Sequence, residues 1–384
     1  MATGRIGIDV TSALSQGGGI GRYTRELVRA LVAQDSQYQF RLFSAKISSP
    51  YPVTEPLPAA TNRVTHHMAP LSERWLYRIW YRARLPLPVQ WVTGQLDLFH
   101  SPDFVLPPVS DGIPTLLTIH DLSFIHYPDV FPPPLIVYLN RVVPWSVKRA
   151  SHLLADSKAT KEDLCAIWHV PAEKVTVLYS GVSDFFRPVV DEQVLTSMRQ
   201  KYSLGKPYIL AVGTVQPRKN YQMLIRAFRV VAEQLPMQLV IAGGQGWMEE
   251  EMLAEVRRQN LEERVSFIGF VDDNDLPAVY SAAALLAFPS IYEGFGLPIL
   301  EAMACGTPAL ISNASCLPEV GGAAAVQLSP FDEPGWSRAM ISLLGDKQKL
   351  AEMSAAGIMQ AQRFSWDKAA KQLLEIYHRL TNRQ

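Results

Sequence analysis

The chain has 384 residues, of which 48% are hydrophobic and 19% are charged. At about 100–200 residues per domain this length favours two domains, and the composition is that of a globular protein rather than a disordered or coiled-coil chain. Lys+Arg and Asp+Glu each number 36, so the formal net charge is zero. A chain without an overall basic field is not expected to bind nucleic acid, and any charged ligand must be met by a local group of residues.

The cysteines Cys165, Cys305 and Cys316 are widely spaced. They form neither a disulfide framework nor a CxxC metal pair, which favours a reducing, cytoplasmic compartment. Asp9 stands where a signal peptide would need apolar residues, and no run approaches the ~18 apolar residues of a membrane span. We therefore expect a protein that is soluble or bound at a membrane surface.

Short apolar runs alternate with helical periodicity through the first half of the chain. Such alternation predicts a parallel sheet covered by helices on both faces. The predicted strands are 5–10, 39–44, 96–100, 115–120, 152–155 and 175–179, and the helices between them include 20–33, 134–150 and 159–168.

The second half repeats the alternation and predicts a second parallel sheet. Its strands are 208–212, 238–242, 265–268, 285–288 and 309–312, with helices at 221–235, 248–260, 275–282 and 298–304. After Ser329 the pattern is helical to the end of the chain.

Two sheet units in series need a boundary, and the segment 183–206 lies between strand patterns with Pro188 and Gly205 in it. We predict an N-terminal domain at 1–183, a hinge at 184–206, a C-terminal domain at 207–364 and a last helix at 365–384 that packs back on the first domain. Ligands of open parallel sheets bind at the carboxyl ends of the strands, where helix N-termini present their amides. Chemistry is therefore expected in a cleft between two facing domains.

A glycine-rich loop, GGGIGRY from Gly17, follows the first strand and opens the first helix. Glycines let a backbone approach a ligand closely and expose amides to an anion. The dinucleotide pattern GxGxxG is absent, and the second strand ends without the acid that would hold a ribose. A loop facing a phosphate or sugar fits best, and a plain structural turn is the alternative.

His120 and Asp121 end an apolar strand, TLLTIHD, at the edge where this architecture places active residues. A lone histidine is more often structural than functional, but at the end of this strand both interpretations of His120 stay open.

The segment GTVQPRKN (213–220) follows the first strand of the second domain and contains the adjacent cations Arg218 and Lys219. Arginine can grip a diphosphate as a fork while lysine acts as a point charge. The alternative is a pair of solvated charges. Cations at a helix start oppose the helix dipole, however, so we favour an anion site.

The segment FPSIYEGFGLPILEA (288–302) is the most informative. Glu293 ends a loop after a strand, glycines expose amides beside it, and Pro298 suits the first turn of the helix that carries Glu301. Carboxylates in this spacing can accept hydrogen bonds from hydroxyl groups. The alternative is that Glu301 only stabilises its helix, because a carboxylate near a helix N-terminus interacts favourably with the helix dipole.

No metal site is predicted. The run Asp272–Asp275 precedes a helix and is interpreted as an N-cap run, while His66 and His67 lack a partner at ligand spacing. The segment Arg74–Arg84 mixes aromatic residues with arginines. It suits either a membrane surface or an amphipathic helix that walls the cleft.

Over nearly its whole length the chain resembles glycosyltransferase family 4, the retaining transferases of the GT-B fold. The motifs that carry the resemblance are GGGIGRYTREL, TIHDLSFIHYPDVF, HLLADSKATKEDL, GTVQPRKN and EGFGLPILEAMACGTPALIS. The resemblance implies an α/β fold of two Rossmann-like domains facing across a cleft, of which the first binds the acceptor and the second a nucleotide sugar. GTVQPRKN is similar to a bacterial branch associated with mannosyl transfer in surface-polysaccharide synthesis.

The resemblance also implies roles for matching positions. Glu293 would hold the donor sugar's hydroxyls together with the amides of Gly294, Phe295 and Gly296, and Glu301 would hold the nucleotide ribose. Arg218 and Lys219 would neutralise the diphosphate, and His120 would contact the donor sugar near the reacting centre. The remaining donor-binding positions are Gly18, Gly19, Gly213, Gly269, Phe270, Val271 and Leu297.

We therefore expect a metal-independent, retaining hexosyltransferase without a cofactor. Its donor is a nucleotide sugar, with GDP-mannose as first choice, and its acceptor is a saccharide or a lipid-linked sugar. The alternatives are another GT-B enzyme (a sugar-nucleotide epimerase or a phosphorylase) and a non-catalytic sugar-nucleotide-binding protein. An epimerase needs an acid/base pair and a phosphorylase a lysine-bound cofactor, and neither signature is found.

Overall fold

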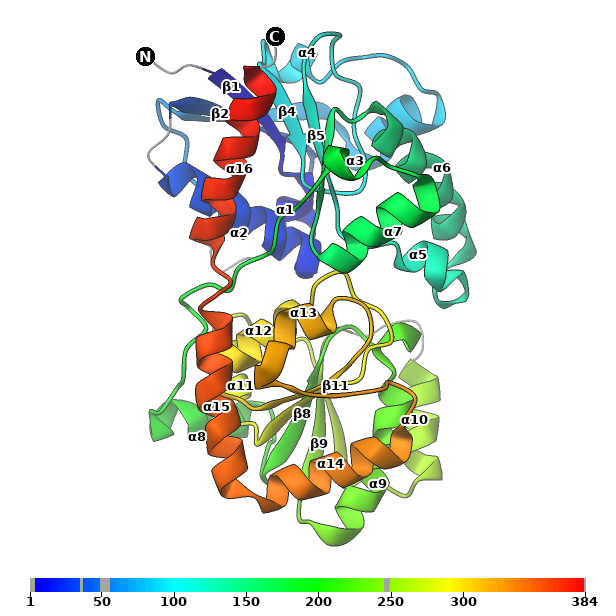
Figure 1. The fold of residues 1–384 in the computed structure, drawn as a ribbon, viewed down its shortest axis with the longest axis vertical. Coiled ribbons are helices and arrows are strands. Elements are labelled where there is room, and N and C mark those ends of the chain that lie inside the picture. The colour runs from blue at the N-terminus through cyan, green and yellow to red at the C-terminus, as the bar shows by residue number, and fades with distance from the viewer. Residues whose placement is uncertain (1–3, 35–36, 49–55, 245–248, 383–384) are drawn as a thin grey trace. The chain divides into compact units, whose positions relative to one another are not determined.

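A computed structural model describes residues 4–34, 37–48, 56–244 and 249–382. The backbone divides into two compact units (Figure 1). Unit 1 comprises residues 1–181 together with 366–384, and unit 2 comprises residues 182–365. Each unit contains one fully parallel sheet, which confirms the predicted α/β class.

The sheet of unit 1 has seven strands in the order β3-β2-β1-β4-β5-β6-β7. The three strands β4, β5 and β6 are buried at every residue, as expected for strands that helices cover on both faces. The strands are β1 (Gly4–Asp9), β2 (Tyr38–Lys46), β3 (Val64–Ser72), β4 (Leu98–Ser101), β5 (Thr115–Ile119), β6 (His152–Ala155) and β7 (Val175–Val177).

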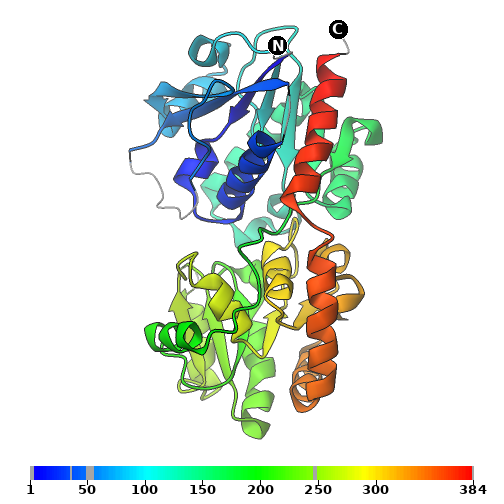
Figure 2. The same ribbon diagram turned by 90° about the vertical axis from the view of Figure 1, so that its left-hand side faces the viewer.

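The helices of unit 1 come from both ends of the chain. The last helix, α16 (Trp366–Thr381), lies beside α2 (Gly19–Ala33) in this unit (Figures 1 and 2). The others are α1 (Thr11–Ser15), α3 (Glu73–Leu76), η1 (Tyr77–Arg82), α4 (Gln90–Thr93), α5 (Ser123–His126), η2 (Pro128–Val130), α6 (Pro133–Arg149), α7 (Lys158–Trp168) and η3 (Ala172–Lys174).

The sheet of unit 2 has six strands in the order β10-β9-β8-β11-β12-β13. They are β8 (Tyr208–Val212), β9 (Gln238–Ala242), β10 (Val265–Gly269), β11 (Leu285–Phe288), β12 (Ala309–Ser312) and β13 (Val326–Leu328). The helices are α8 (Glu192–Lys201), η4 (Pro217–Lys219), α9 (Tyr221–Gln234), α10 (Glu249–Arg258), α11 (Leu276–Ser281), α12 (Leu297–Ala304), α13 (Leu317–Gly321), η5 (Gly322–Ala324), α14 (Glu333–Gly345) and α15 (Lys347–Ala361).

Several elements differ from the sequence-based expectations. The strands β3 and β13 were not predicted, and the segment proposed as a hinge contains α8 and lies in unit 2. Asp275 does stand at the N-cap position of α11, but its side chain makes no capping hydrogen bond. Instead Asp272 and Asp275 both pair with Lys201, so this acidic run ties α8 to the start of α11.

The two sheets share one arrangement of strands. In each, the first strand of the unit lies between the second strand and the fourth, at β2-β1-β4 in unit 1 and at β9-β8-β11 in unit 2. The strand order reverses there, and in open parallel sheets the crevice at such a reversal is the usual place for a ligand. The fold therefore directs attention to the loops after β1 and β4, and after β8 and β11.

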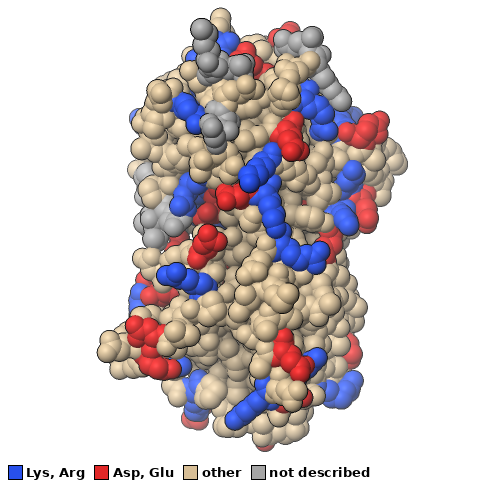
Figure 3. All heavy atoms as spheres, turned by 60° about the vertical axis from the view of Figure 1, so that its left-hand side comes forward, with Lys and Arg blue, Asp and Glu red and all other residues tan. Residues whose placement is uncertain are grey.

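Charged side chains of both signs are interspersed on the face shown in Figure 3. This distribution agrees with the zero formal net charge of the chain. Within the described ranges, no helix combines the length and the hydropathy that a membrane span requires.

Candidate functional site

The loops after β8 and β11 bring Arg218, Lys219 and Glu293 together in unit 2. Because the two strands are parallel neighbours, their carboxyl ends meet at one edge of the sheet. Lys219 Nζ lies 2.6 Å from Glu293 Oε1, and Arg218 lies 2.6 Å from Oε2 of the same carboxylate. Lys219 and Glu293 are both buried. One carboxylate between two cations leaves the group with a net positive charge.

The electrostatics of this group are dominated by the two cations. Burial alone would raise the pKa of Glu293, but Arg218 and Lys219 outweigh burial and lower the pKa to about 2. The Lys219 ammonium also lies 4.8 Å from the centroid of the Phe288 ring, which is a cation–π contact. The glutamate is therefore ionised at neutral pH, and it orients both cations.

The absence of a side chain at Gly213 leaves room for the side chain of Lys219. Gly213 has φ +143°, and a Cβ there would lie 2.8 Å from Lys219 Cε. Asn220 fixes the other side of the loop, since its amide donates to the carbonyls of Pro289 and Pro330 at 3.2 and 2.6 Å. Asn220 was not among the predicted site residues, although its left-handed backbone at φ 60° is a conformation that asparagine adopts readily.

The loop from Glu293 to Gly296 is held through its carbonyl groups. Ser315 and Cys316 both donate to the carbonyl of Glu293, and Cys316 Sγ also donates to Phe295 O at 3.0 Å. The buried amides of Gly294 and Gly296 have no hydrogen-bond acceptor within the described part of the chain. Buried N–H groups are rarely left unpaired, so these two amides suit a ligand.

Gly296 and Leu297 begin α12, which carries Glu301. Gly296 has φ +110°, which favours glycine, and it is the N-cap residue. Glu301 is only 4% exposed, and its Oε2 accepts a hydrogen bond of 2.8 Å from the hydroxyl of Tyr280. Tyr280 thus orients the carboxylate of Glu301, which is predicted to bind the ribose of the nucleotide.

The predicted donor-binding positions Gly269, Phe270 and Val271 lie at the end of β10, two strands away from β8 in the sheet. Gly269 has φ +70°, and its carbonyl accepts a hydrogen bond of 2.8 Å from Gly243 N. Phe270 is half exposed and Val271 is buried. The structure thus places this segment at the same edge of the sheet as the cations but on a different strand.

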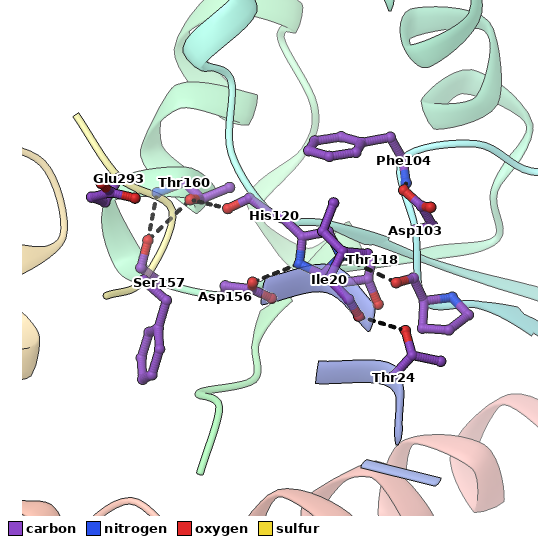
Figure 4. A network of polar contacts seen from close by, with 12 residues as sticks. Ile20, Thr24, Asp103, Phe104, Thr118, His120, Asp156, Ser157, Thr160 and Glu293 are labelled. Carbon is purple, nitrogen blue, oxygen red and sulfur yellow. Dashed lines mark hydrogen bonds and ion pairs between the residues drawn. The ribbon is translucent and has the colours of Figure 1, made fainter. Parts of the chain in front are cut away.

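In unit 1, His120 and Asp156 follow the neighbouring strands β5 and β6 (Figure 4). His120 Nδ1 lies 2.7 Å from Asp156 Oδ2, and Nε2 lies 3.1 Å from the carbonyl of Pro102. Burial lowers the pKa of His120, but the charge and hydrogen bond of Asp156, with a contribution from Asp103, raise it to about 9. Both ring nitrogens face acceptors, so the arrangement suits a charged imidazolium.

Two aromatic rings enclose this histidine. Tyr23 meets the His120 ring edge-on with centroids 4.9 Å apart, and Phe104 does so at 5.4 Å. Trp366 of α16 contacts Tyr23 in turn at 5.7 Å. Asp156 and these rings were not predicted as site residues. The one available signal was the position of Asp156 directly after a buried strand, in the motif HLLADS.

The glycine loop leads into α2, and the predicted ligand contact of Gly18 and Gly19 stays a prediction. Both residues are exposed at the start of α2, and a Cβ at either would meet nothing within 4 Å. At Gly21, by contrast, a Cβ would lie 2.1 Å from the carbonyl oxygen of Gln16. The steric requirement for glycine in this motif is thus at Gly21, where α2 meets the turn before it.

Replacing Glu293 by glutamine should make unfolding less sensitive to acid. Because the folded pKa of about 2 lies below the ordinary 4.5, the ionised form stabilises the fold above pH 4.5, and this contribution is lost as the pH falls from 4.5 towards 2. The stability gap between wild type and Glu293→Gln should therefore narrow by about 2 kcal/mol between pH 7 and pH 3, because pH 3 lies about 1.5 units below the ordinary pKa of 4.5 and each unit is worth about 1.4 kcal/mol.

Urea denaturation between pH 7 and pH 3 measures this gap. Glu333→Gln is the control, because Glu333 pairs with Arg226 at a solvent-exposed position. An acid dependence in Glu293→Gln equal to that of wild type would contradict the assignment of the shifted carboxylate.

Comparison with known proteins gives the family. A model described as Glycosyltransferase Family 4 matches residues 17–184, and one described as Glycosyl transferases group 1 matches residues 196–360. The chain is 31% identical to O-antigen chain mannosyltransferase B of Escherichia coli, over 94% of this chain and 95% of that protein. It is 33% identical to O-antigen chain mannosyltransferase RfbU of Salmonella typhimurium, over 58% of this chain and 59% of that protein.

Solved structures agree on the fold. Sucrose-phosphate synthase from Thermosynechococcus elongatus matches with a TM-score of 0.76 and 22% identity, over 98% of this chain and 99% of that chain. Anabaena HepE in complex with UDP and glucose matches with a TM-score of 0.72 and 19% identity, over 97% and 99%. Two predictions are confirmed. The fold is GT-B, and the protein is a transferase rather than an epimerase, a phosphorylase or a non-catalytic binding protein. The chain belongs to glycosyltransferase family 4 and is a glycosyltransferase.

Proposed function

We propose that this enzyme transfers mannose from GDP-mannose to a hydroxyl group of a saccharide or lipid-linked acceptor, with retention of the anomeric configuration, in polysaccharide synthesis. The choice of mannose is supported by two of the relatives that align with the chain, both of them O-antigen chain mannosyltransferases. The observation that carries a nucleotide-sugar donor is the buried group of Arg218, Lys219 and Glu293, with two unpaired amides beside it.

The group can exchange its internal ion pairs for contacts to a donor. A diphosphate carries more negative charge than one carboxylate, so it competes with Glu293 for Arg218 and Lys219. Glu293 oxygens released from the cations then accept hydrogen bonds from the sugar hydroxyls. The amides of Gly294 and Gly296 bind oxygens of the same ligand. Two protein cations supply the charge that a divalent metal would otherwise supply, and the proposed reaction uses no metal.

The proposed reaction is a substitution on one face of the sugar. The acceptor oxygen forms a bond to the anomeric carbon, the bond from that carbon to the diphosphate oxygen breaks, and the acceptor proton moves to the departing phosphate. Arg218 and Lys219 stabilise the charge that develops on the leaving diphosphate. The rest of the rate gain comes from holding the two substrates in position.

Replacing both cations in Arg218→Ala/Lys219→Ala should reduce kcat for mannosyl transfer by at least ~10²–10³, the usual cost of one lost charge-stabilising contact. Release of GDP from GDP-mannose in the presence of acceptor gives the rate. The control is Arg226→Ala, which removes a cation from the exposed face of α9. Unchanged turnover in the double variant would overturn the mechanism.

The choice of donor predicts which nucleotide stabilises the fold. A ligand that binds only the folded chain raises the Tm by an amount that grows with its concentration. We expect GDP and GDP-mannose to raise the Tm more than UDP and UDP-glucose at equal concentration in a thermal-shift assay. A larger Tm increase with UDP-glucose would show that the donor is not GDP-mannose, and it would leave the proposed transfer mechanism unchanged.

The segment Arg74–Arg84 has two different faces. Its inner face carries buried Leu76, Trp80 and Tyr81, and its outer face carries exposed Arg78 and Arg82. Trp75 is 52% exposed and lies under the guanidinium of Arg78, at 4.9 Å from its ring centroid. Arginines beside an exposed tryptophan suit the surface of an anionic bilayer. We infer that this outer face rests on a membrane that carries the acceptor.

Arg78→Ala/Arg82→Ala should reduce binding to vesicles that contain anionic phospholipid, by about 1 kcal/mol per removed arginine or roughly 30-fold for the pair. Vesicle co-sedimentation at low salt measures the effect, and Arg226→Ala again serves as the control. If the double variant binds the vesicles as tightly as Arg226→Ala does, this face of the segment does not contact the membrane.

A further inference from the structure

Unit 1 contains a cavity of about 530 Å³ that the donor chemistry does not use. It lies at the carboxyl ends of β1, β2 and β4, where the strand order of the sheet reverses. The segment of α3 and η1 supplies one wall, and Pro134, Leu135 and Tyr138 of α6 supply another. Its volume is in the range of pockets that bind small molecules.

Carboxylates provide most of the charge in this cavity. Asp9, Glu73 and Asp103 line it, and Arg74 is the cation in the lining. Asp9 Oδ1 accepts a hydrogen bond of 2.9 Å from Thr11 N, and Asp103 Oδ1 accepts one of 2.6 Å from Phe104 N. Each of the two aspartates is therefore anchored to the backbone, and Asp103 Oδ2 has no partner within the described ranges.

The carboxylates also act on one another. Burial raises the pKa of Asp9 to about 6, and the charges of Asp103 and Glu73 add to the increase. Burial likewise raises the pKa of Asp103, and burial together with the charge of Asp103 raises that of Glu73. A site in which negative charges already repel one another disfavours an anionic ligand and accepts hydrogen bonds from neutral hydroxyl groups.

Tyr81 supplies a second kind of polar group. Its side chain is 7% exposed and lines the cavity, and its hydroxyl has no hydrogen-bond partner among the residues that the structure describes. The nearby charges of Asp9 and Asp103 add to the effect of burial in raising the pKa of this phenol. The hydroxyl therefore stays protonated near the carboxylates, and it can donate a hydrogen bond to a ligand in the cavity.

Aromatic rings form the apolar part of the lining. Tyr77 and Tyr138 pack edge-on with centroids 4.9 Å apart, and Phe43 and Trp80 lie 5.8 Å apart. Sugars combine apolar C–H faces with hydroxyl groups, so they match a pocket of rings and carboxylates. A phosphate or a carboxylated sugar would meet three carboxylates and one arginine.

We propose that this cavity binds an uncharged saccharide end of the acceptor, with Asp9, Asp103 and Tyr81 bonded to its hydroxyls and the aromatic side chains packed on its C–H faces. The proposal rests on the glycosyl transfer proposed above, and it narrows the acceptor to one whose recognised part is a neutral sugar. Phosphorylated and acidic acceptors are excluded from this cavity.

Asp9→Asn should weaken binding of a neutral oligomannoside to the intact chain by about 10-fold or more, the worth of one hydrogen bond to a charged group. Tyr81→Phe should weaken it by roughly 2- to 10-fold, the worth of one hydrogen bond between neutral groups. Saturation-transfer NMR titration without donor measures this binding, so the result does not depend on turnover. The thermal shift caused by GDP should stay as in wild type. Tyr38→Phe is the matched control, because Tyr38 is a buried tyrosine of unit 1 that does not line the cavity and whose hydroxyl has no hydrogen-bond partner in the described part of the chain.

The outcomes separate this proposal from the proposed function. Loss of oligomannoside binding in both variants, with the GDP shift retained, supports the cavity even if the donor proves not to be GDP-mannose. Wild-type affinity in both variants overturns it. Failure of wild type to bind the oligomannoside, or binding of mannose 6-phosphate as tight as that of methyl mannoside, also overturns it. A thermal melt shows whether either variant has lost its fold. If one variant is unfolded, the oligomannoside affinity of the other variant decides whether the cavity binds the saccharide.

Discussion

The ion pairs of Glu293 with Arg218 and Lys219 hold the candidate donor site of unit 2 together. Three charged groups with little access to water remain there because each lies 2.6 Å from an opposite charge. Removing one member of such a buried group typically costs about 3–5 kcal/mol, because a charge is left uncompensated. The loops after β8 and β11 are therefore coupled, and a ligand that separates the glutamate from its cations must replace what it breaks. A diphosphate joined to a polyhydroxylated sugar carries both kinds of replacement in one molecule.

The same strand order serves two different chemistries in the two units. At the reversal in unit 2 the loops carry cations and unpaired amides, whereas at the reversal in unit 1 they carry carboxylates and phenols. One backbone plan thus presents a site for an anion and a site for neutral hydroxyls, and the difference comes from side chains alone. This division agrees with the proposed binding of a charged donor and an uncharged acceptor.

The sequence predicted most of the sheet strands because buried parallel strands are continuous apolar runs. It did not predict β3, whose exposed positions include Thr65, His66 and Met68, or the short β13. Arg218, Lys219 and Glu293, which the structure brings together, could be singled out because they fall in two contiguous motifs. The cavity of unit 1 was not found, because Asp9, Glu73 and Asp103 lie in three distant segments and only the fold brings them together. The pairing of His120 with Asp156 was missed for the same reason.

Unit 1 is assembled from both ends of the described chain, and its interior depends on the last helix. His100 is fully buried on β4, and its Nδ1 lies 2.8 Å from the hydroxyl of Tyr377 on α16. Residues 182–365, by contrast, form unit 2 from one continuous stretch. During synthesis on the ribosome, the stretch made second can complete its core before the stretch made first, which waits for α16 to emerge. Unit 1 can therefore complete its core only after the whole of unit 2 has been synthesised.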